Sequence, residues 1–372
     1  MVKKTSADSG NGHHPQSVER ASQRMVDLAD KVVQDPDGTE RQLNQLADLI
    51  EEYLTAGQDQ IIERALEKAP DSRVYDEIMD DVLACIEWRT VSGDDAEPLD
   101  LILFAVPLHL TLYAPADKVV VPWVLPVVDT LAGSFRRHGL IGNAPDVLLY
   151  NYLYSFAELE ALSYSKRYQL PQRILKTLVS SRPVDLFQHD ERIDLPPGEA
   201  HLLLRFMVGL VMQTPEEPQP FISDDEDEEN VMQQLNGWVN TVAREVETQL
   251  QGPDLEVICV ASLPALLQTA LQEGYRQHRE LALQIVVSQT ADESGGAAML
   301  SAFITLPATQ PVLTITLIHK DRDLPVLYYP WQLAPWDDPE TVIDSISLVL
   351  GNAGIQDIQF GEQAPYRVPY LH

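Results

Sequence analysis

Cysteine is scarce in this sequence, which contains only Cys85 and Cys259 among its 372 residues. Both lie within apolar runs, "VLACIEW" and "LEVICVAS", where cysteine packs as a small hydrophobic residue. There is no Cys-x-x-Cys pair and no spaced Cys/His set, so the sequence does not predict a zinc site. Two thiols also cannot form a disulfide framework. We therefore expect two buried free thiols and a reducing, cytoplasmic location.

Long hydrophobic runs are also missing. A membrane-spanning helix needs about 18 or more consecutive apolar residues. The most apolar segment, "VVVPWVLPVVDTLAGSF", is interrupted by Pro122, Pro126 and Asp129. The N-terminus begins with basic residues, but the apolar stretch that a secretory signal requires does not follow them. The sequence thus predicts neither membrane insertion nor a Sec signal peptide.

Basic residues are few: 26 lysines and arginines stand against 57 aspartates and glutamates, for a formal net charge of −31. This charge repels phosphate, so direct nucleic-acid binding is not expected. Contact with anionic membrane surfaces is disfavoured for the same reason. A basic protein partner would be attracted, although the same charge can serve solubility alone.

Familiar catalytic motifs are absent as well. The sequence has no nucleophile elbow, Walker loop, dinucleotide fingerprint or HExxH. Its Gly-Gly loop, "ESGGAAM" (293–299), lacks the Lys-Ser/Thr of a phosphate-binding loop and predicts a turn. "HKDRD" places His319, Asp321 and Asp323 at a predicted hairpin tip, and His109 in an apolar segment predicts a core histidine. No metal or cofactor is expected.

What is present begins with helices. Residues 1–14 are polar and aperiodic, which predicts a disordered tail. Apolar residues then recur every three or four positions, as in amphipathic helices. Such helices are predicted over 16–34, from Thr39 to Gly57, and over 59–68 and 71–86. Their short turns indicate an antiparallel helical array.

The middle of the chain changes character. "EWRTVSG" and "LDLILFAV" are typical of two strands that can form a hairpin. A helix broken near its prolines is expected over 118–138, and further helices over 170–181 and 197–212. "DVLLYNYLYSF" (146–156) fits either a buried strand or a helix. These elements together predict a mainly helical domain over 15–212.

Residues 213–230 are rich in proline and then in acids, which predicts a linker between two domains. Its acidic run consists of Asp224, Asp225, Glu226, Asp227, Glu228 and Glu229. The run can be the solvated start of a helix, a docking site for a basic partner, or a metal site. Ser223 and Glu226 match an S-x-x-E capping box, and acids in a first turn are stabilised by the helix dipole. A calcium loop would need a glycine at its sixth position, which is missing. We favour the helix start and keep the six acids as candidates for partner binding.

Residues 231–372 predict an α+β domain. A strand is expected over 255–261 and a helix over 262–276, while 280–289 fits either state and its Val-rich end favours a strand. "AMLSAFITL", "PVLTITLIH", "LPVLYYPW" and "IQDIQF" are typical of strands. Asp338 is expected to cap a helix that ends at Gly351. Strands grouped between helices indicate a mostly antiparallel sheet, so the chain as a whole is expected to be α+β with a helical array at its N-terminal side.

Four aromatic residues lie close together in "LYYPWQLAPWDDPE": Tyr328, Tyr329, Trp331 and Trp336. Exposed tyrosine and tryptophan dominate the hot spots of protein interfaces. A strand end can equally pack its aromatic residues under the following helix. These four side chains are the second set of candidates for partner contacts.

Several segments also carry a resemblance: "LADLIEEYL", "QIIERALEKAPDSRVYDEIMDDV", "LDLILFAVPL" and "LPVLYYPW…DDPETVIDSISLVLGNAGIQDI". Together they make the layout from about residue 40 to 360 resemble an uncharacterised family of beta-proteobacterial cytoplasmic proteins of unknown function. The resemblance implies a bacterial cytoplasmic origin and no established activity.

The sequence therefore predicts a non-enzymatic cytoplasmic protein that acts through protein–protein contacts, as an adaptor, an assembly factor or an accessory subunit of a bacterial system. Two alternatives stay open. An acidic regulator could occupy a nucleic-acid-binding protein by imitating phosphate charge with Asp224–Glu229. An enzyme could assemble its site from scattered residues, of which His319, Asp321, Asp323, Asp337 and Asp338 are the first to test. The sequence fixes neither the partner nor the oligomeric state.

Overall fold

The computed structural model describes residues 15–34, 40–91, 97–114, 121, 123–142, 145–180, 198–221, 228–306 and 312–361. The predicted tail, 1–14, lies outside them. Within the described ranges, no helix combines the length and the apolar character needed to cross a membrane. The chain is an α+β protein with a helical array at its N-terminal side and a mostly antiparallel sheet in its C-terminal part, as predicted.

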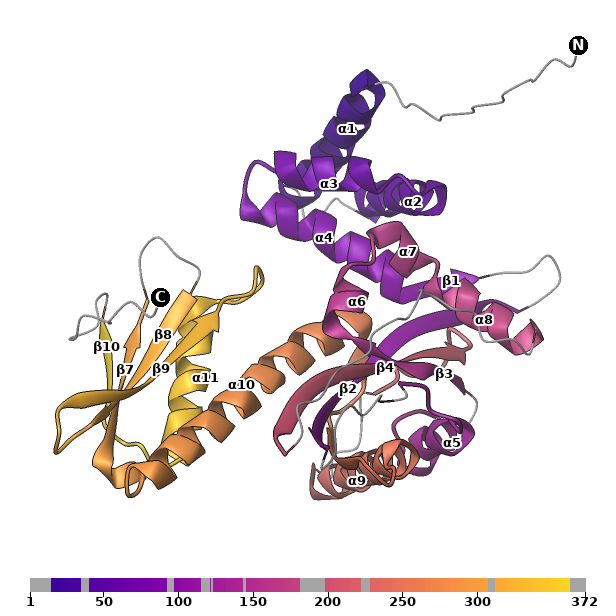
Figure 1. Ribbon diagram of the computed structural model, residues 1–372. Helices are drawn as coiled ribbons and strands as arrows, with labels where there is room; N and C mark the ends of the chain where they lie inside the picture. The colour runs from indigo at the N-terminus through magenta and orange to yellow at the C-terminus, as the bar shows by residue number, and fades with distance from the viewer. Residues whose placement is uncertain are drawn as a thin grey trace, which may run out of the picture. The chain divides into compact units, whose positions relative to one another are not determined.

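The chain forms two compact units (Figure 1). Unit 1 holds Met1–Leu108, Tyr113–Glu199 and Arg205–Ala270. Unit 2 holds His109–Leu112, Ala200–Leu204 and Leu271–His372. The division falls near residue 270 and not at the predicted linker over 213–230, because the elements that follow this linker pack into unit 1.

Unit 1 begins with four helices: α1 (Pro15–Gln34), α2 (Glu40–Ala56), α3 (Asp59–Lys68) and α4 (Ser72–Glu87). They pack against one another and confirm the predicted array. Gly57 ends α2 with a φ of 68°, a conformation that glycine adopts without strain. The Asp71 carboxylate caps α4 by accepting a hydrogen bond from the Val74 N–H at 3.1 Å.

A six-stranded sheet follows in the chain: β1 (Trp88–Val91), β2 (Leu99–Tyr113), β3 (Asp146–Ser155), β4 (Ala200–Gln213), β5 (Glu256–Ala261) and β6 (Ala265–Leu266). The strand order is β1-β2-β4-β3, and both β5 and β6 pair with β2. β1 and β2 are antiparallel, which confirms the predicted hairpin. The sequence of 146–156 allowed either a buried strand or a helix, and the structure shows the strand β3 over Asp146–Ser155.

The prediction of a helix over 197–212 was wrong, since these residues form most of β4. β4 lies between β2 and β3 and is buried along most of its length, so residues 206–212 form a continuous apolar run instead of the alternation expected of a half-exposed strand. β2, β3 and β4 lie in one sheet, so the range 15–212 contains more strand structure than the small hairpin that was predicted beside its helices.

The remaining helices of unit 1 are α5 (Asp129–Arg137), α6 (Phe156–Glu160), α7 (Tyr164–Tyr168), α8 (Leu170–Ser180) and α9 (Glu228–Leu250). Within the described part of the helix predicted over 118–138, the helical residues are those of α5, and Val124 upstream forms a β-bridge with Tyr152. α5 and α9 pack side by side below the sheet (Figure 1). The ring of Phe135 joins Phe104 of the sheet to Trp238 of α9, with centroid distances of 5.3 and 5.1 Å.

A substitution at Gly209 of β4 can test how closely the core around Phe104 is packed. A Cβ at this position would lie 2.9 Å from Cδ2 of Leu149 and still closer to the ring of Phe104, which is fully buried. We expect Gly209→Ala to lower the free energy of unfolding by about 1–3 kcal/mol, because the core must shift to accept a methyl group. The measurement is chemical denaturation followed by tryptophan fluorescence.

Gly133 in α5 provides the matched control, since nothing lies within 4 Å of a Cβ built there. Gly133→Ala should stabilise the protein by up to about 1 kcal/mol through helix propensity. Equal effects of the two substitutions would contradict the packing described for β4.

The described residues of unit 2 form a second sheet and two α-helices, and α10 (Leu267–Glu293) leads into this unit. The sheet comprises β7 (Leu300–Thr305), β8 (Val312–His319), β9 (Leu324–Gln332) and β10 (Ile358–Gly361), with α11 (Pro339–Asn352) preceding the last strand. The order is β10-β7-β8-β9; β10 is parallel to β7, and the other pairs are antiparallel. Leu283 and Val287 of α10 share one core with Ile346 of α11 and one face of the sheet.

The lean towards a strand over 280–289 was wrong, because these residues lie inside α10. Leu283, Val287 and Ala291 recur every four residues and pack against the sheet. The Val-rich composition favours a strand locally. The segment is helical because these three apolar side chains lie on one face of α10 and pack into the core of unit 2.

Candidate functional site

The four aromatic candidates occupy different environments. Trp331 is 1% exposed and belongs to the core of unit 2, against which Tyr329 also packs. Tyr328 points to the other face of the sheet, where it pairs with Thr316 of β8. The Trp336 ring lies 6.4 Å from Tyr275 of α10. The alternative of aromatics packed under the following helix therefore applies to Tyr329 and Trp331.

Arg279 of α10 organises this region. Its guanidinium donates two hydrogen bonds to the Asp337 carboxylate, at 2.8 and 3.1 Å, and one to the backbone carbonyl of Gln332 at 2.7 Å. It also lies over the rings of Tyr275 and Trp331, at 4.6 and 4.8 Å. Arg279 could not be assigned to this region from the sequence, because it lies far from the aromatic cluster along the chain.

The acids near the aromatic cluster have structural roles. Asp337 also accepts a hydrogen bond from the Ala334 N–H at 2.8 Å, which closes the turn after β9. Asp338 caps α11, as predicted, by accepting from the Thr341 N–H at 2.9 Å. The backbone and hydroxyl hydrogen bonds from Thr341 lower the pKa of the Asp338 carboxyl.

The predicted hairpin tip is present between β8 and β9. His319 is buried at the end of β8, whereas Asp321 and Asp323 are exposed in the turn. Asp323 adopts a φ of 51° and donates its N–H to the His319 carbonyl at 2.8 Å. In the described parts of the chain, no three His, Cys, Asp or Glu side chains are placed to hold a metal ion.

The acidic run is only partly described. Asp224, Asp225, Glu226 and Asp227 lie outside the described residues, as does the predicted capping box. Glu228 and Glu229 form the start of α9, so the helix predicted after the run is confirmed.

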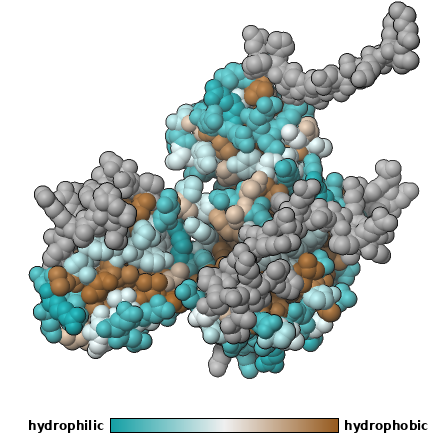
Figure 2. Space-filling model, viewed as in Figure 1, coloured by the Kyte–Doolittle hydropathy of each residue, from teal (hydrophilic) through white to brown (hydrophobic). Residues whose placement is uncertain are grey.

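Apolar side chains are exposed on β9. Leu324 is 58% exposed and Val326 39%, and we call these two residues the β9 pair. β9 is an edge strand, and the exposed acids Asp321 and Asp323 directly precede the pair. Figure 2 shows hydrophobic residues gathered into a brown band on the visible face of unit 2, to which β9 belongs. An exposed apolar group beside acids is the kind of surface that a protein partner covers.

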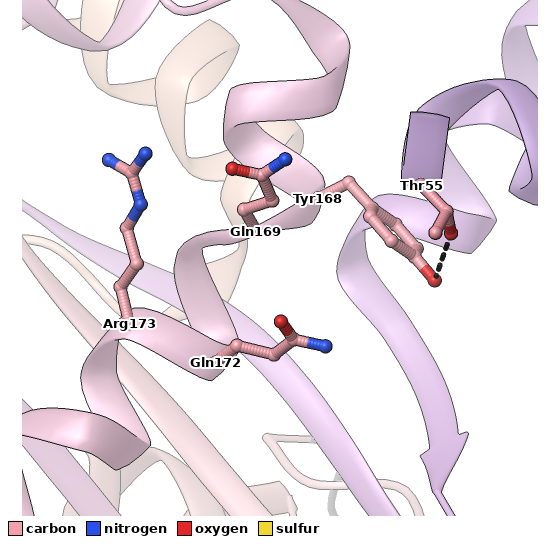
Figure 3. A pocket seen from close by; sticks show the side chains of 5 residues that line it. All are labelled: Thr55, Tyr168, Gln169, Gln172 and Arg173. Carbon is pink, nitrogen blue, oxygen red and sulfur yellow. Dashed lines mark hydrogen bonds between the residues drawn. The ribbon is translucent and has the colours of Figure 1, made fainter. Parts of the chain in front are cut away.

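Unit 1 has a polar hollow of about 170 Å³ (Figure 3). It is lined by side chains from α2, α7, α8 and the residue between the last two helices: Thr55, Tyr168, Gln169, Gln172 and Arg173. The Thr55 hydroxyl lies 3.4 Å from the Tyr168 hydroxyl, which donates a hydrogen bond to Glu51 at 2.8 Å. We call this feature the Tyr168 hollow.

Charged groups adjoin the Tyr168 hollow. The guanidinium of Arg89 lies 4.6 Å from the centroid of the Tyr168 ring, and its Nε and Nη2 atoms are buried without a hydrogen-bond partner among the described residues. Arg167, the residue before Tyr168, donates to the Gln268 side chain at 3.0 Å. The Gln268 N–H in turn donates to the Glu87 carboxylate. Burial raises the pKa of Glu87 to about 7, against the opposing effects of this N–H and of Arg167.

His109 and the two cysteines lie in buried or partly buried positions, as predicted. His109 is buried and lies 3.4 Å from the Gln277 side chain, and burial lowers its pKa. Both thiols are free; Cys259 is buried and Cys85 partly so. Burial raises the pKa of each thiol to about 12, which makes them poor nucleophiles.

Comparison with known proteins relates this chain to one protein family that covers most of its length. A family model described as a protein of unknown function (DUF2863) matches residues 11–305, well over half of the chain. This match includes the N-terminal helices and β2, which carried the resemblance in the sequence, but not "LPVLYYPW" in β9. No curated protein and no solved structure matches the chain.

Proposed function

We propose that this chain, which belongs to the DUF2863 family of proteins of unknown function, is a non-enzymatic cytoplasmic protein that acts through protein–protein contacts. It would serve as an adaptor, an assembly factor or an accessory subunit of a bacterial system, with a beta-proteobacterial origin. Its partner would be a basic protein, and neither nucleic acid nor the membrane would be bound directly.

The β9 pair is the observation that carries this proposal. Leu324 and Val326 expose apolar surface on an edge strand, and burying such surface contributes about 25 cal/mol per Å² to association. Pro325 and Pro330 lack the N–H that an added strand would need from β9. The contact is therefore made by side chains and not by strand addition.

Charge defines the chemistry of the partner. Asp321 and Asp323 are exposed beside the β9 pair, and the whole chain carries a net charge of −31. A partner segment with apolar side chains flanked by lysine or arginine would complement both features. The acids would mainly speed association, whereas the apolar pair would slow dissociation.

Affinity capture from the source cells tests the proposal. The tagged protein is used at about 50 and about 300 mM salt, which shortens the Debye length and weakens charge attraction. We expect a stoichiometric basic partner with the wild-type chain and its loss with Leu324→Ser/Val326→Ser, because the apolar contact is removed.

Leu348→Ser is the matched control, since Leu348 of α11 is 65% exposed and lies outside β9. It should retain the partner. Capture that is unaffected by the β9 substitutions, or the absence of any partner at either salt concentration, would refute the proposal.

A further inference from the structure

We propose that the Tyr168 hollow binds a small anionic ligand through a single carboxylate or phosphate group, with Arg173 as its charged contact. This site goes beyond the proposed protein–protein function and lies in unit 1, whereas the β9 pair lies in unit 2.

The first observation that supports an anion site is that Arg173 lacks a partner for its charge among the described residues. It lines the hollow and is half-buried, yet among the described residues it forms no ion pair and no side-chain hydrogen bond. A guanidinium offers a planar set of N–H donors that fits the two oxygens of a carboxylate or phosphate.

The other lining groups provide neutral donors. The side-chain amides of Gln169 and Gln172 are not engaged in hydrogen bonds within the described structure, whereas the Thr55 hydroxyl already donates to the Tyr168 hydroxyl. Figure 3 shows Gln169, Gln172 and Tyr168 grouped between Arg173 on one side and Thr55 on the other. None of the five lining side chains is an acid, so none would repel an anion directly.

Arg89 adds positive charge next to the hollow. It lies over the ring of Tyr168, and two of its nitrogen atoms are buried with no hydrogen-bond partner in the part of the chain that the structure describes. Glu51 is an acid in contact with the lining of the hollow, and its carboxylate already accepts a hydrogen bond from the Tyr168 hydroxyl. The lining itself therefore presents uncommitted donors together with positive charge.

The size of the hollow limits the ligand. Pockets for drug-sized molecules measure about 300–1,000 Å³, whereas this hollow measures about 170 Å³. It suits a ligand with a few heavy atoms or the acidic end of a larger metabolite. The same donors can bind either a carboxylate or a phosphate. Anions of both kinds are therefore titrated in the experiment that follows.

The test is isothermal titration calorimetry on the full chain with inorganic phosphate, acetate and citrate, in separate titrations at constant ionic strength. We expect one of these anions to bind, with phosphate alone indicating a phosphate site and either carboxylate alone a carboxylate site. Arg173→Gln should weaken this binding by about tenfold or more, since hydrogen bonds to a charged group are lost. Thermal unfolding without ligand establishes that the variant is folded.

Arg73→Gln is the control, because Arg73 is exposed and pairs only with Asp71 in the described structure. It should bind the anion as the wild type does. The inference is overturned if none of the three anions binds, or if Arg173→Gln and Arg73→Gln bind equally well. Because capture of a partner by the β9 pair is measured separately, either proposal can fail without the other.

Discussion

Replacing Arg279 by methionine should lower the free energy of unfolding by about 3–5 kcal/mol. The substitution leaves the Asp337 carboxylate buried without its counter-charge, and removing one member of a buried pair costs this much. It also removes the hydrogen bond to the Gln332 carbonyl and the stacking on Tyr275 and Trp331. Chemical denaturation followed by tryptophan fluorescence is the measurement, because Trp331 and Trp336 report on this region.

Arg276 lies one turn earlier on α10 and provides the control. It pairs with Glu273 and Glu280, but its side chain is far more exposed than that of Arg279. Arg276→Met should therefore cost no more than about 1 kcal/mol. If the two methionine variants were equally stable, the buried pair of Arg279 and Asp337 would not contribute the expected free energy to the folded state.

Replacing Glu87 by glutamine should stabilise the protein at pH 8 and have little effect below pH 4.5. Glu87 is 7% exposed, and burial raises its pKa from an ordinary value of 4.5 to about 7. The folded state therefore binds a proton more tightly than the unfolded state does. The stability that this proton contributes is fully present below pH 4.5 and is lost as the pH rises through about 7. A shift of this size corresponds to about 3 kcal/mol at most.

The measurement is the difference in unfolding free energy between Glu87→Gln and wild type from pH 4 to 8. Glutamine keeps an oxygen that can accept the Gln268 N–H, so the hydrogen bond need not be lost. Asp76→Asn, which removes a carboxyl group from an exposed position on the same helix, is the control substitution. A difference for Glu87→Gln that is constant across this range would exclude a raised pKa for Glu87.

Local chemistry was enough to predict many elements of the fold. The Asp338 cap, Gly57 at the end of α2 and the period of the N-terminal helices each depend on a few neighbouring residues. β4 was missed because a strand buried in the middle of a sheet loses its alternation. The helical state of 280–289 depends on a core to which distant strands contribute.

The candidate sites were predictable only in part. Tyr328, Tyr329, Trp331 and Trp336 were found as a group, but the burial of Trp331 depends on α10 and α11. Arg279 and Asp337 meet only in the folded chain, and no local pattern joins them. The Tyr168 hollow likewise brings Thr55 of α2 to Arg173 of α8, and neither residue belongs to a motif.

The central claim is that the β9 pair binds a protein partner, and the most direct test is the affinity of the purified complex. Calorimetry should give a Kd at least about tenfold higher for Leu324→Ser/Val326→Ser than for wild type, since two apolar contacts are lost. Leu348→Ser should leave the Kd within about twofold of the wild-type value. Equal affinities for the wild type and the β9 variant would contradict the account.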